Sequence, residues 1–316
     1  MNWDDLEIVP TLSHQAGLKA YLYVTVYDEG WPLGLKTERS TSFHNSGHGQ
    51  EISWQSYFTI NHPNYLTTNK SGDDCQWGVL SLAHKQVRSF LCQRFQHLLN
   101  NTDFDGLFVC LRSQSKPPDF ADEFGFDEPI REDYYRQYKH DIRSDKFNLH
   151  LWRELQGKYL TQFLYDLRVL TKESGHLLGV GCPRGDIIGP PLGNASLQWG
   201  EWVENELVDD LVVNQSSSQC PSLWINLWPM HQGPGYIQDY RTGAGMPNIK
   251  SQIDTEYGPK ILNSPVDLYI AWQWSKPSPT EEMAIHSHEA VTGLVYSSFR
   301  NDNAKVIGEH KGDWTF

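Results

Sequence analysis

Acidic residues follow several of the predicted strands, and they are the groups in this sequence best suited to proton transfer. Asp28 and Glu29 end the first predicted strand, Asp186 follows the third, and Glu128 lies in the long loop after the second. Two such carboxyl groups can protonate a leaving oxygen and attack a sugar or activate water, which is the chemistry of glycosidic-bond cleavage. We predict that Glu128, Asp186 and Asp28 are catalytic and that Glu29 contacts the substrate.

Each of these assignments has a structural alternative. Acidic residues mostly lie on solvated loops, and Asp186 could instead hold a turn. Glu128 is the favoured acid because two phenylalanines and a proline flank it in FGFDEP (124–129). Apolar surroundings raise the pKa of a carboxyl group, as a general acid requires.

Arginine and amide side chains near the same strand ends supply further substrate contacts. Fixed amides suit sugar hydroxyl groups, and arginine forms bidentate hydrogen bonds with carboxylates. The alternative is that each arginine pairs with acidic neighbours, because the chain holds 39 of them. Tryptophan offers a flat apolar face to a sugar ring, although most tryptophans in long loops pack those loops. Besides Glu29, the predicted substrate-binding residues are Arg112, Gln114, Arg184, Asn214, Gln215, Trp274 and Arg300.

The sequence predicts neither a metal centre nor a cofactor. The two histidines of HNSGH (44–48) lie in a loop-like stretch that shows no third ligand. The stretch GVGCPRG (179–185) follows a strand, but it lacks the GxGxxG spacing of a dinucleotide-binding loop.

Charge and hydropathy exclude several classes of partner. The 26 Lys and Arg residues against 39 Asp and Glu residues give a net charge of −13, which repels phosphate backbones and anionic lipids. We therefore expect no nucleic acid or membrane partner. No apolar run approaches the roughly 18–20 residues of a spanning helix. Acidic residues stand where a signal peptide would be basic, so we expect a cytoplasmic chain unless an upstream segment directs export.

Apolar segments alternate with helical patterns along the chain. The predicted buried strands cover residues 20–27, 106–111, 177–182, 211–214, 266–272 and 293–299. Apolar positions at helical spacing lie between them at 87–99, 159–170, 199–207 and 249–261. This alternation predicts βα units and a parallel sheet.

The connections between these elements differ in length. The helix-to-strand links are short, whereas the strand-to-helix links at 29–83, 112–156 and 215–248 are long. The additional chain therefore lies beyond the carboxyl ends of the strands, where barrels and open α/β sheets both place their active sites.

The strand count predicts an incomplete (β/α)₈ TIM-barrel-like domain. A complete barrel needs eight strands, and the sequence shows six. A helical pattern at residues 3–17 precedes the first strand, and Pro10 can mark the start of that helix. We expect a single domain over residues 1–316 that lacks the first two βα units and has six parallel strands in one curved sheet.

Three stretches resemble the glycosyl-hydrolase-like family 10 proteins, which are bacterial TIM barrels. GVLSLAHKQVRSFLCQRFQHLLNNTDFDGLFVCLRS (78–113) resembles the family's helix and fourth strand, and LQWGEWVENELVDDLVVNQ (197–215) resembles a later helix and strand. AGLKAYLYVTVYDEG (16–30) is similar to its third strand. The resemblance covers most of residues 14–302 and implies two further βα units before the first strand seen here.

One departure from the family pattern bears on function. The family resemblance implies an acidic residue near the end of the strand that follows the Asp105–Gly106 pair, but this chain has Cys110 and Arg112 there. The leading hypothesis is a glycoside hydrolase that acts on a polysaccharide or oligosaccharide. The alternatives are a non-catalytic carbohydrate-binding barrel and an inactive fragment of a longer enzyme. Carbohydrate is the expected partner in the first two cases, and the sequence assigns no oligomeric state.

Overall fold

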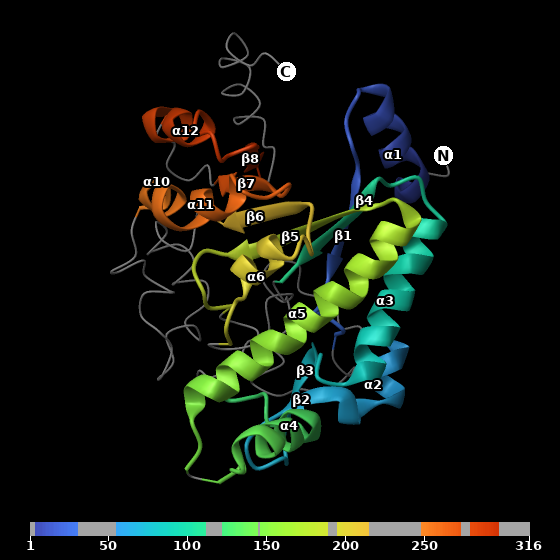
Figure 1. The fold of residues 1–316 in the computed structure, drawn as a ribbon. Coiled ribbons are helices and arrows are strands. Elements are labelled where there is room, and N and C mark those ends of the chain that lie inside the picture. Colours follow the sequence, from blue (N-terminus) through green and yellow to red (C-terminus); the bar gives the residue numbers. More distant parts are fainter. Residues whose placement is uncertain are drawn as a thin grey trace, which may run out of the picture.

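The computed structural model describes residues 4–30, 55–111, 122–144, 146–188, 195–214, 248–272 and 279–296. Within these residues, the main sheet contains six parallel strands in the order β1-β4-β5-β6-β7-β8 (Figure 1). They are β1 (Tyr21–Thr25), β4 (Gly106–Cys110), β5 (Leu177–Pro183), β6 (Asp210–Asn214), β7 (Asp267–Trp272) and β8 (Gly293–Tyr296). All six coincide with predicted strands, which confirms the α/β class and the parallel arrangement. In the described part of the chain, β1 and β8 pair on one side only, so the barrel is incomplete.

One hydrogen bond across the sheet shows that it is strongly curved. The Tyr21 hydroxyl group on β1 donates to Asp210 Oδ2 on β6 at 2.7 Å, although β4 and β5 lie between these strands. In a flat sheet, strands three places apart would be separated by about 14 Å. That separation exceeds the combined reach of the two side chains. The sheet must therefore curl so that β1 and β6 face each other, as in a barrel.

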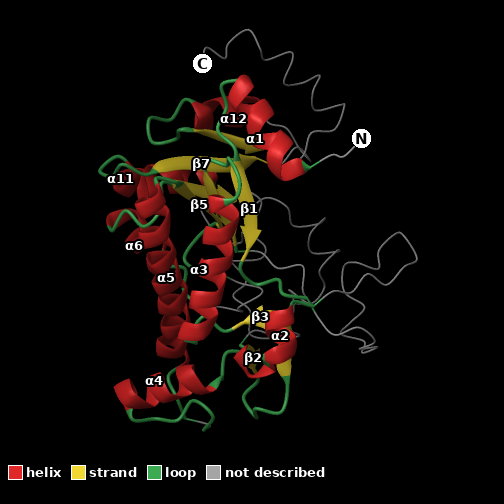
Figure 2. Ribbon diagram, turned by 90° about the vertical axis from the view of Figure 1, so that its right-hand side faces the viewer, coloured by secondary structure: helices red, strands yellow, loops and turns green. Residues whose placement is uncertain are grey.

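A small antiparallel sheet lies beyond the carboxyl end of β1 (Figure 2). It consists of β2 (Leu66–Thr68) and β3 (Cys75–Leu80), in a segment that the sequence predicts as a loop. Asn69 holds its turn, because Asn69 Oδ1 accepts from the backbone N–H groups of Gly72, Asp73 and Asp74. The long link after β1 therefore contains a small folded sheet.

Helices cover one face of the main sheet (Figure 2). Helices α1, α3, α5 and α6 agree with the predicted patterns, and the pattern at 249–261 forms α10, a π-helical turn η5 and α11 without a break. Helix α1 passes through Pro10 and begins after Asp4, whose side chain accepts from Leu6 N. The helices are α1 (Asp5–Gln15), α2 (Tyr57–Asn61), α3 (Lys85–Asn100), α4 (Glu128–Tyr138), α5 (Leu149–Ser174), α6 (Trp199–Glu204), α10 (Ile249–Gln252), η5 (Ile253–Tyr257), α11 (Gly258–Ile261) and α12 (Pro279–His286), with a 3₁₀ turn η3 (Pro63–Tyr65).

The long link expected at residues 112–156 contains helical structure that the sequence does not predict. Helix α4 lies inside this segment, and α5 begins at Leu149. Only Ile130 and Tyr134 of α4 are buried, so its apolar periodicity is too weak to be detected among the charged residues around it. Together with Phe126, Ile142, Trp152 and Leu155, these two form a second small core apart from that of the sheet.

The described residues contain neither a membrane-spanning helix nor a disulfide bond. None of the described helices is long and apolar enough to cross a membrane. Four cysteines in the described residues are free thiols, and Cys220 lies outside those residues.

Close packing at Gly157 holds α5 against the segment that precedes α6. A Cβ atom at this position would come within 2.3 Å of the Ser196 carbonyl oxygen. The Ser196 N–H group donates to the Arg153 carbonyl oxygen at 3.1 Å, so the two backbones are joined where they approach each other. Only glycine leaves room for this contact.

We predict that Gly157→Ala destabilises the protein by about 1–3 kcal/mol, because overpacking against backbone cannot be relieved by a side-chain rotation. Urea titration followed by circular dichroism measures the change. Gly200→Ala in α6 is the control, because its new Cβ would meet only the flexible Lys260 side chain at 3.1 Å. The control should keep native stability or gain up to about 1 kcal/mol from higher helix propensity. Equal effects of the two substitutions would contradict the prediction.

Candidate active site

The carboxyl end of β1 carries the best-placed acidic residues of the described chain. Asp28 and Glu29 follow the strand by three and four residues, and their exposed fractions are 9% and 0%. The Glu29 N–H group donates to the Gly78 carbonyl oxygen of β3, and the Glu29 carbonyl oxygen accepts from Ser56 N. These bonds fix the backbone beside Asp28 against the small sheet and against the start of α2.

The Glu29 carboxylate forms an ion pair with the helix layer. Arg94 Nη2 of α3 lies 2.7 Å from Glu29 Oε1. The Arg94 guanidinium group also lies over the rings of Phe90 and Phe95, at 5.1 and 5.2 Å from their centroids. Glu29 therefore joins the end of β1 to α3. Its predicted contact with substrate stays a prediction.

Two of the predicted binding residues share an edge with Asp28. Asn214 at the end of β6 is the register partner of Pro183, and Arg184 follows Pro183 directly. Arg184 is fully buried. The next residue, Gly185, donates its N–H group to the Tyr257 hydroxyl group at 3.0 Å, which fixes the chain after β5. Because β1, β5 and β6 are parallel, these residues follow strand ends on one side of the sheet.

The Asp186 side chain has a structural partner. Its carboxylate accepts from Trp199 Nε1 of α6 at 2.9 Å, and its carbonyl oxygen accepts from Leu197 N at 2.8 Å. Ile187 and Ser196 form an antiparallel bridge just beyond it. This is the turn-holding role that the sequence allows beside the catalytic one. As a catalytic residue, Asp186 stays a prediction.

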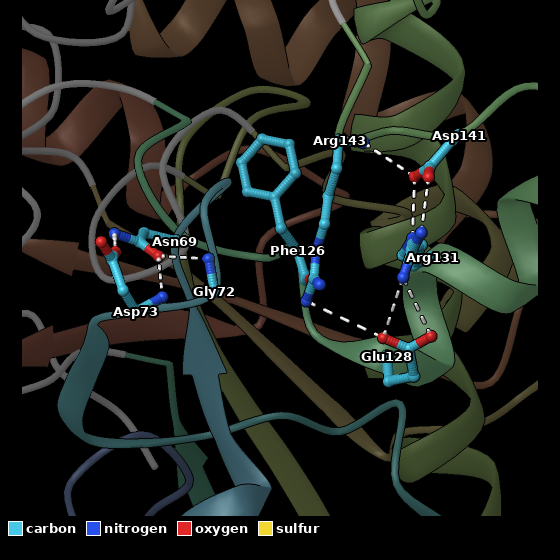
Figure 3. Close-up of polar contacts among 8 residues, drawn as sticks. All are labelled: Asn69, Gly72, Asp73, Phe126, Glu128, Arg131, Asp141 and Arg143. Atoms are coloured by element: carbon cyan, nitrogen blue, oxygen red, sulfur yellow. Dashed lines mark hydrogen bonds and ion pairs between the residues drawn. The ribbon is translucent and has the colours of Figure 1, made fainter.

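The apolar surroundings expected for Glu128 are not found, while its catalytic role stays a prediction. The Glu128 side chain is 54% exposed at the start of α4 and pairs with Arg131 at 3.3 Å and Arg143 at 3.8 Å. Figure 3 shows Glu128 facing both arginines, with Asp141 on the far side of Arg131. Arg131 donates two hydrogen bonds to Asp141, which lower the pKa of that carboxyl group to about 2. Glu128 thus belongs to a surface ion network.

The buried acid of this segment is the preceding residue, Asp127. Its exposed fraction is 2%, and Asp127 Oδ2 accepts from the Ser81 hydroxyl group at 2.5 Å. Desolvation raises the pKa of Asp127 to about 6, against the lowering effect of the Ser81 hydrogen bond. Sequence reasoning missed this residue. The available signal was its place just before Glu128 and Pro129, since Asp is a preferred residue before a helix and Pro favours its first turn.

Most of the remaining predicted residues lie outside the described part of the chain. Only the backbone of Asn214 is described, and Arg112, Gln114, Gln215, Trp274 and Arg300 lie outside the described residues. Among the described residues, no group of three or more His, Cys, Asp or Glu side chains could hold a metal ion.

We predict that Arg94→Met lowers the free energy of unfolding by about 2–4 kcal/mol, because it leaves the buried Glu29 carboxylate without its ion-pair partner. Arg136→Met on α4 is the matched control. Arg136 also pairs with an aspartate, Asp133 at 2.6 Å, but its side chain is 72% exposed. Its loss should cost less than about 0.5–1 kcal/mol. Similar losses for the two variants in urea titrations would show that the Glu29 pair is no stronger than a surface pair.

Asp127 should make stability depend on pH. Its folded-state pKa of about 6 lies above the value of about 3.9 in an unfolded chain, so the folded protein holds the proton more tightly. Stability is therefore lost as the pH rises from about 4 to about 6, by an amount on the order of 2 kcal/mol. Asp127→Asn should remove this loss, and the variant's stability relative to native should rise over that range. Glu128→Gln removes a charge that is only a minor cause of the raised Asp127 pKa, so most of the loss should remain in urea titrations between pH 4 and 7.

Comparison with known proteins identifies the fold. No protein-family model matches the sequence, and no curated protein matches it. Among solved structures, the chain is similar to the PgaB (BpsB) glycoside hydrolase domain from Bordetella bronchiseptica, with a TM-score of 0.54 and 14% identity over 99% of this chain and 79% of that one.

A second similar structure is the catalytic domain of β-amylase from Paenibacillus polymyxa, with a TM-score of 0.51 and 11% identity over 92% of this chain and 78% of that one. The chain spans 57% of the length of a candidate sporulation-specific glycosylase, ydhD, from Bacillus subtilis, at a TM-score of 0.40 and 11% identity. At these identities the comparison shows the fold alone. That fold is the α/β architecture of TIM-barrel glycosidases, with the barrel incomplete.

Proposed function

We propose that this protein is a glycoside hydrolase that acts on a polysaccharide or oligosaccharide. The observation that carries the proposal is the placement of Asp28 and Glu29 at the carboxyl end of the first strand, in a fold similar to those of a glycoside hydrolase domain and a β-amylase catalytic domain. Active sites of such barrels lie at that end of the strands. A closer membership in the glycosyl-hydrolase-like family 10 is supported by the three stretches that resemble it, which form β1, the β3–α3–β4 unit and the α6–β6 unit.

Asp28 is our leading catalytic carboxylate. It lies at the strand end, and the hydrogen bonds of Glu29 to Gly78 and Ser56 fix the backbone next to it. Hydrolysis of a glycosidic bond requires a second carboxyl group about 5–10 Å away. Asp186 is the proposed partner, and it would have to exchange its bond from Trp199 for a substrate contact. Glu128 fits the role of acid less well, because its side chain is 54% exposed and pairs with Arg131 and Arg143.

A non-catalytic carbohydrate-binding barrel is the second candidate. It is favoured by the partners that hold Asp186 and Glu128, two of the three predicted catalytic carboxylates. It is also favoured by the buried Cys110 at the end of β4, where the family resemblance implies an acidic residue.

The test is hydrolysis of a panel of soluble polysaccharides by the native chain, with release of reducing ends as the readout. Asp28→Asn keeps the size of the side chain and should lower kcat about 100-fold or more, the usual loss of a general acid, base or nucleophile. Glu128→Gln is the control and should keep kcat within about twofold, a change of less than 0.5 kcal/mol in the barrier. Undiminished turnover by Asp28→Asn would remove Asp28 from the mechanism. Binding of a polysaccharide by the native chain without any turnover would establish the second candidate.

A further inference from the structure

A cluster of aromatic rings lies beside the candidate active site and has no role in the chemistry described above. Phe58 of α2 stacks face to face on Phe90 of α3, with ring centroids 3.9 Å apart and planes 9° apart. The Tyr65 ring stacks on Phe58 at 5.7 Å, and the His62 ring lies tilted beside Phe58 at 5.0 Å. Tyr65 in turn contacts the ring of His84. We call Phe58, His62 and Tyr65, with their supports His84 and Phe90 and with Tyr57, the exposed residue that precedes Phe58 on α2, the ring platform.

The inner part of the ring platform is packed against the rest of the protein. Phe58, Tyr65 and Phe90 are each partly buried, and His84 is buried enough that its pKa falls to about 4. Arg94, which lies over Phe90, also pairs with Glu29. The platform and the end of β1 are therefore held by the same arginine.

The outer part of the ring platform is open to solvent. Tyr57 is 84% exposed, the largest exposed fraction among the exposed apolar and aromatic side chains of the described chain. His62 is also exposed, as are Asn61 and Asn64 beside it. Flat ring faces with hydroxyl, imidazole and amide groups at their edges match a pyranose ring, which has an apolar C–H face and a rim of hydroxyl groups.

Backbone contacts join the ring platform to the candidate active site. The Ser56 N–H group donates to the Glu29 carbonyl oxygen at 3.0 Å, and Gly30 pairs with Gln55 in an antiparallel bridge. Tyr57 follows Ser56 directly, and Asp28 directly precedes Glu29. Standard backbone dimensions then keep the Cα atoms of Asp28 and Tyr57 within about 15 Å of each other. An oligosaccharide of a few residues spans that distance.

We infer that the ring platform is an oligosaccharide subsite, in which the exposed face of Tyr57 stacks on a neutral pyranose unit of a chain that extends past Asp28. This inference rests on the proposed carbohydrate function but not on catalysis. The net charge of −13 disfavours an anionic polymer at this surface.

Isothermal titration calorimetry with cellohexaose, xylohexaose, maltohexaose and chitohexaose tests the subsite on the full chain. At least one of these hexasaccharides should bind the native protein. Tyr57→Ala should weaken that binding about three- to tenfold, the range expected for loss of one ring contact. Tyr57→Phe keeps the ring and should restore native affinity. Tyr165→Ala on α5, at a tyrosine that is 55% exposed, is the matched control and should bind as the native chain does.

The outcomes separate this inference from the proposed hydrolysis. Hexasaccharide affinity is measured without turnover, so the Tyr57 variants test the subsite, whereas the rate of Asp28→Asn tests hydrolysis. Equal affinity of Tyr57→Ala and native chain overturns the subsite even if hydrolysis is found. No binding of any hexasaccharide at about 10 mM, well above usual KM values, also overturns it. Binding of the chain through Tyr57 to another protein, with no hexasaccharide bound, would make the platform a protein-docking surface instead.

Discussion

Parallel pairing is the constraint on which the rest of this protein depends. Every strand of the main sheet runs in the same direction, so every strand must be followed by a crossover, and all the carboxyl ends lie at one edge. Residues distant in sequence, such as Asp28, Arg184 and Asn214, are thereby delivered to one side of the sheet. The long links can then fold at that edge, and the small sheet and α2 occupy it after β1. The common direction of the strands, more than any single side chain, determines where the candidate site lies.

Apolar periodicity in the sequence was sufficient to find the sheet and most of its helices, because those elements bury one or both faces in a large core. It was insufficient for the small sheet and for α4. The turn of the small sheet depends on Asn69, a polar side chain that accepts three backbone N–H groups. Helix α4 buries two side chains of its eleven residues. Elements held by polar contacts or by a small satellite core leave little trace in an apolar pattern.

The candidate site was predictable at the level of strand ends and not at the level of single carboxylates. Asp127 and Glu128 are neighbours with the same apolar flanks, yet one is buried and the other is solvated. Which of two consecutive residues faces inward depends on where the helix begins and on a partner that lies elsewhere. Here that partner is Ser81, 46 residues away in sequence. Glu29 and Arg94 are likewise far apart in the sequence, so no local sequence pattern indicates that they form a pair.

The curvature of the main sheet has a consequence for how the chain folds. In a closed barrel, a continuous ring of backbone hydrogen bonds sets the curvature, but within the described residues β1 and β8 are not joined. The bond from Tyr21 to Asp210 spans the concave face instead, and its partners are 189 residues apart in sequence. Joining such distant residues closes a large loop, which costs conformational entropy. The pairing of β4 and β5 between the two partners lowers that cost, because the sheet already holds β1 and β6 near each other.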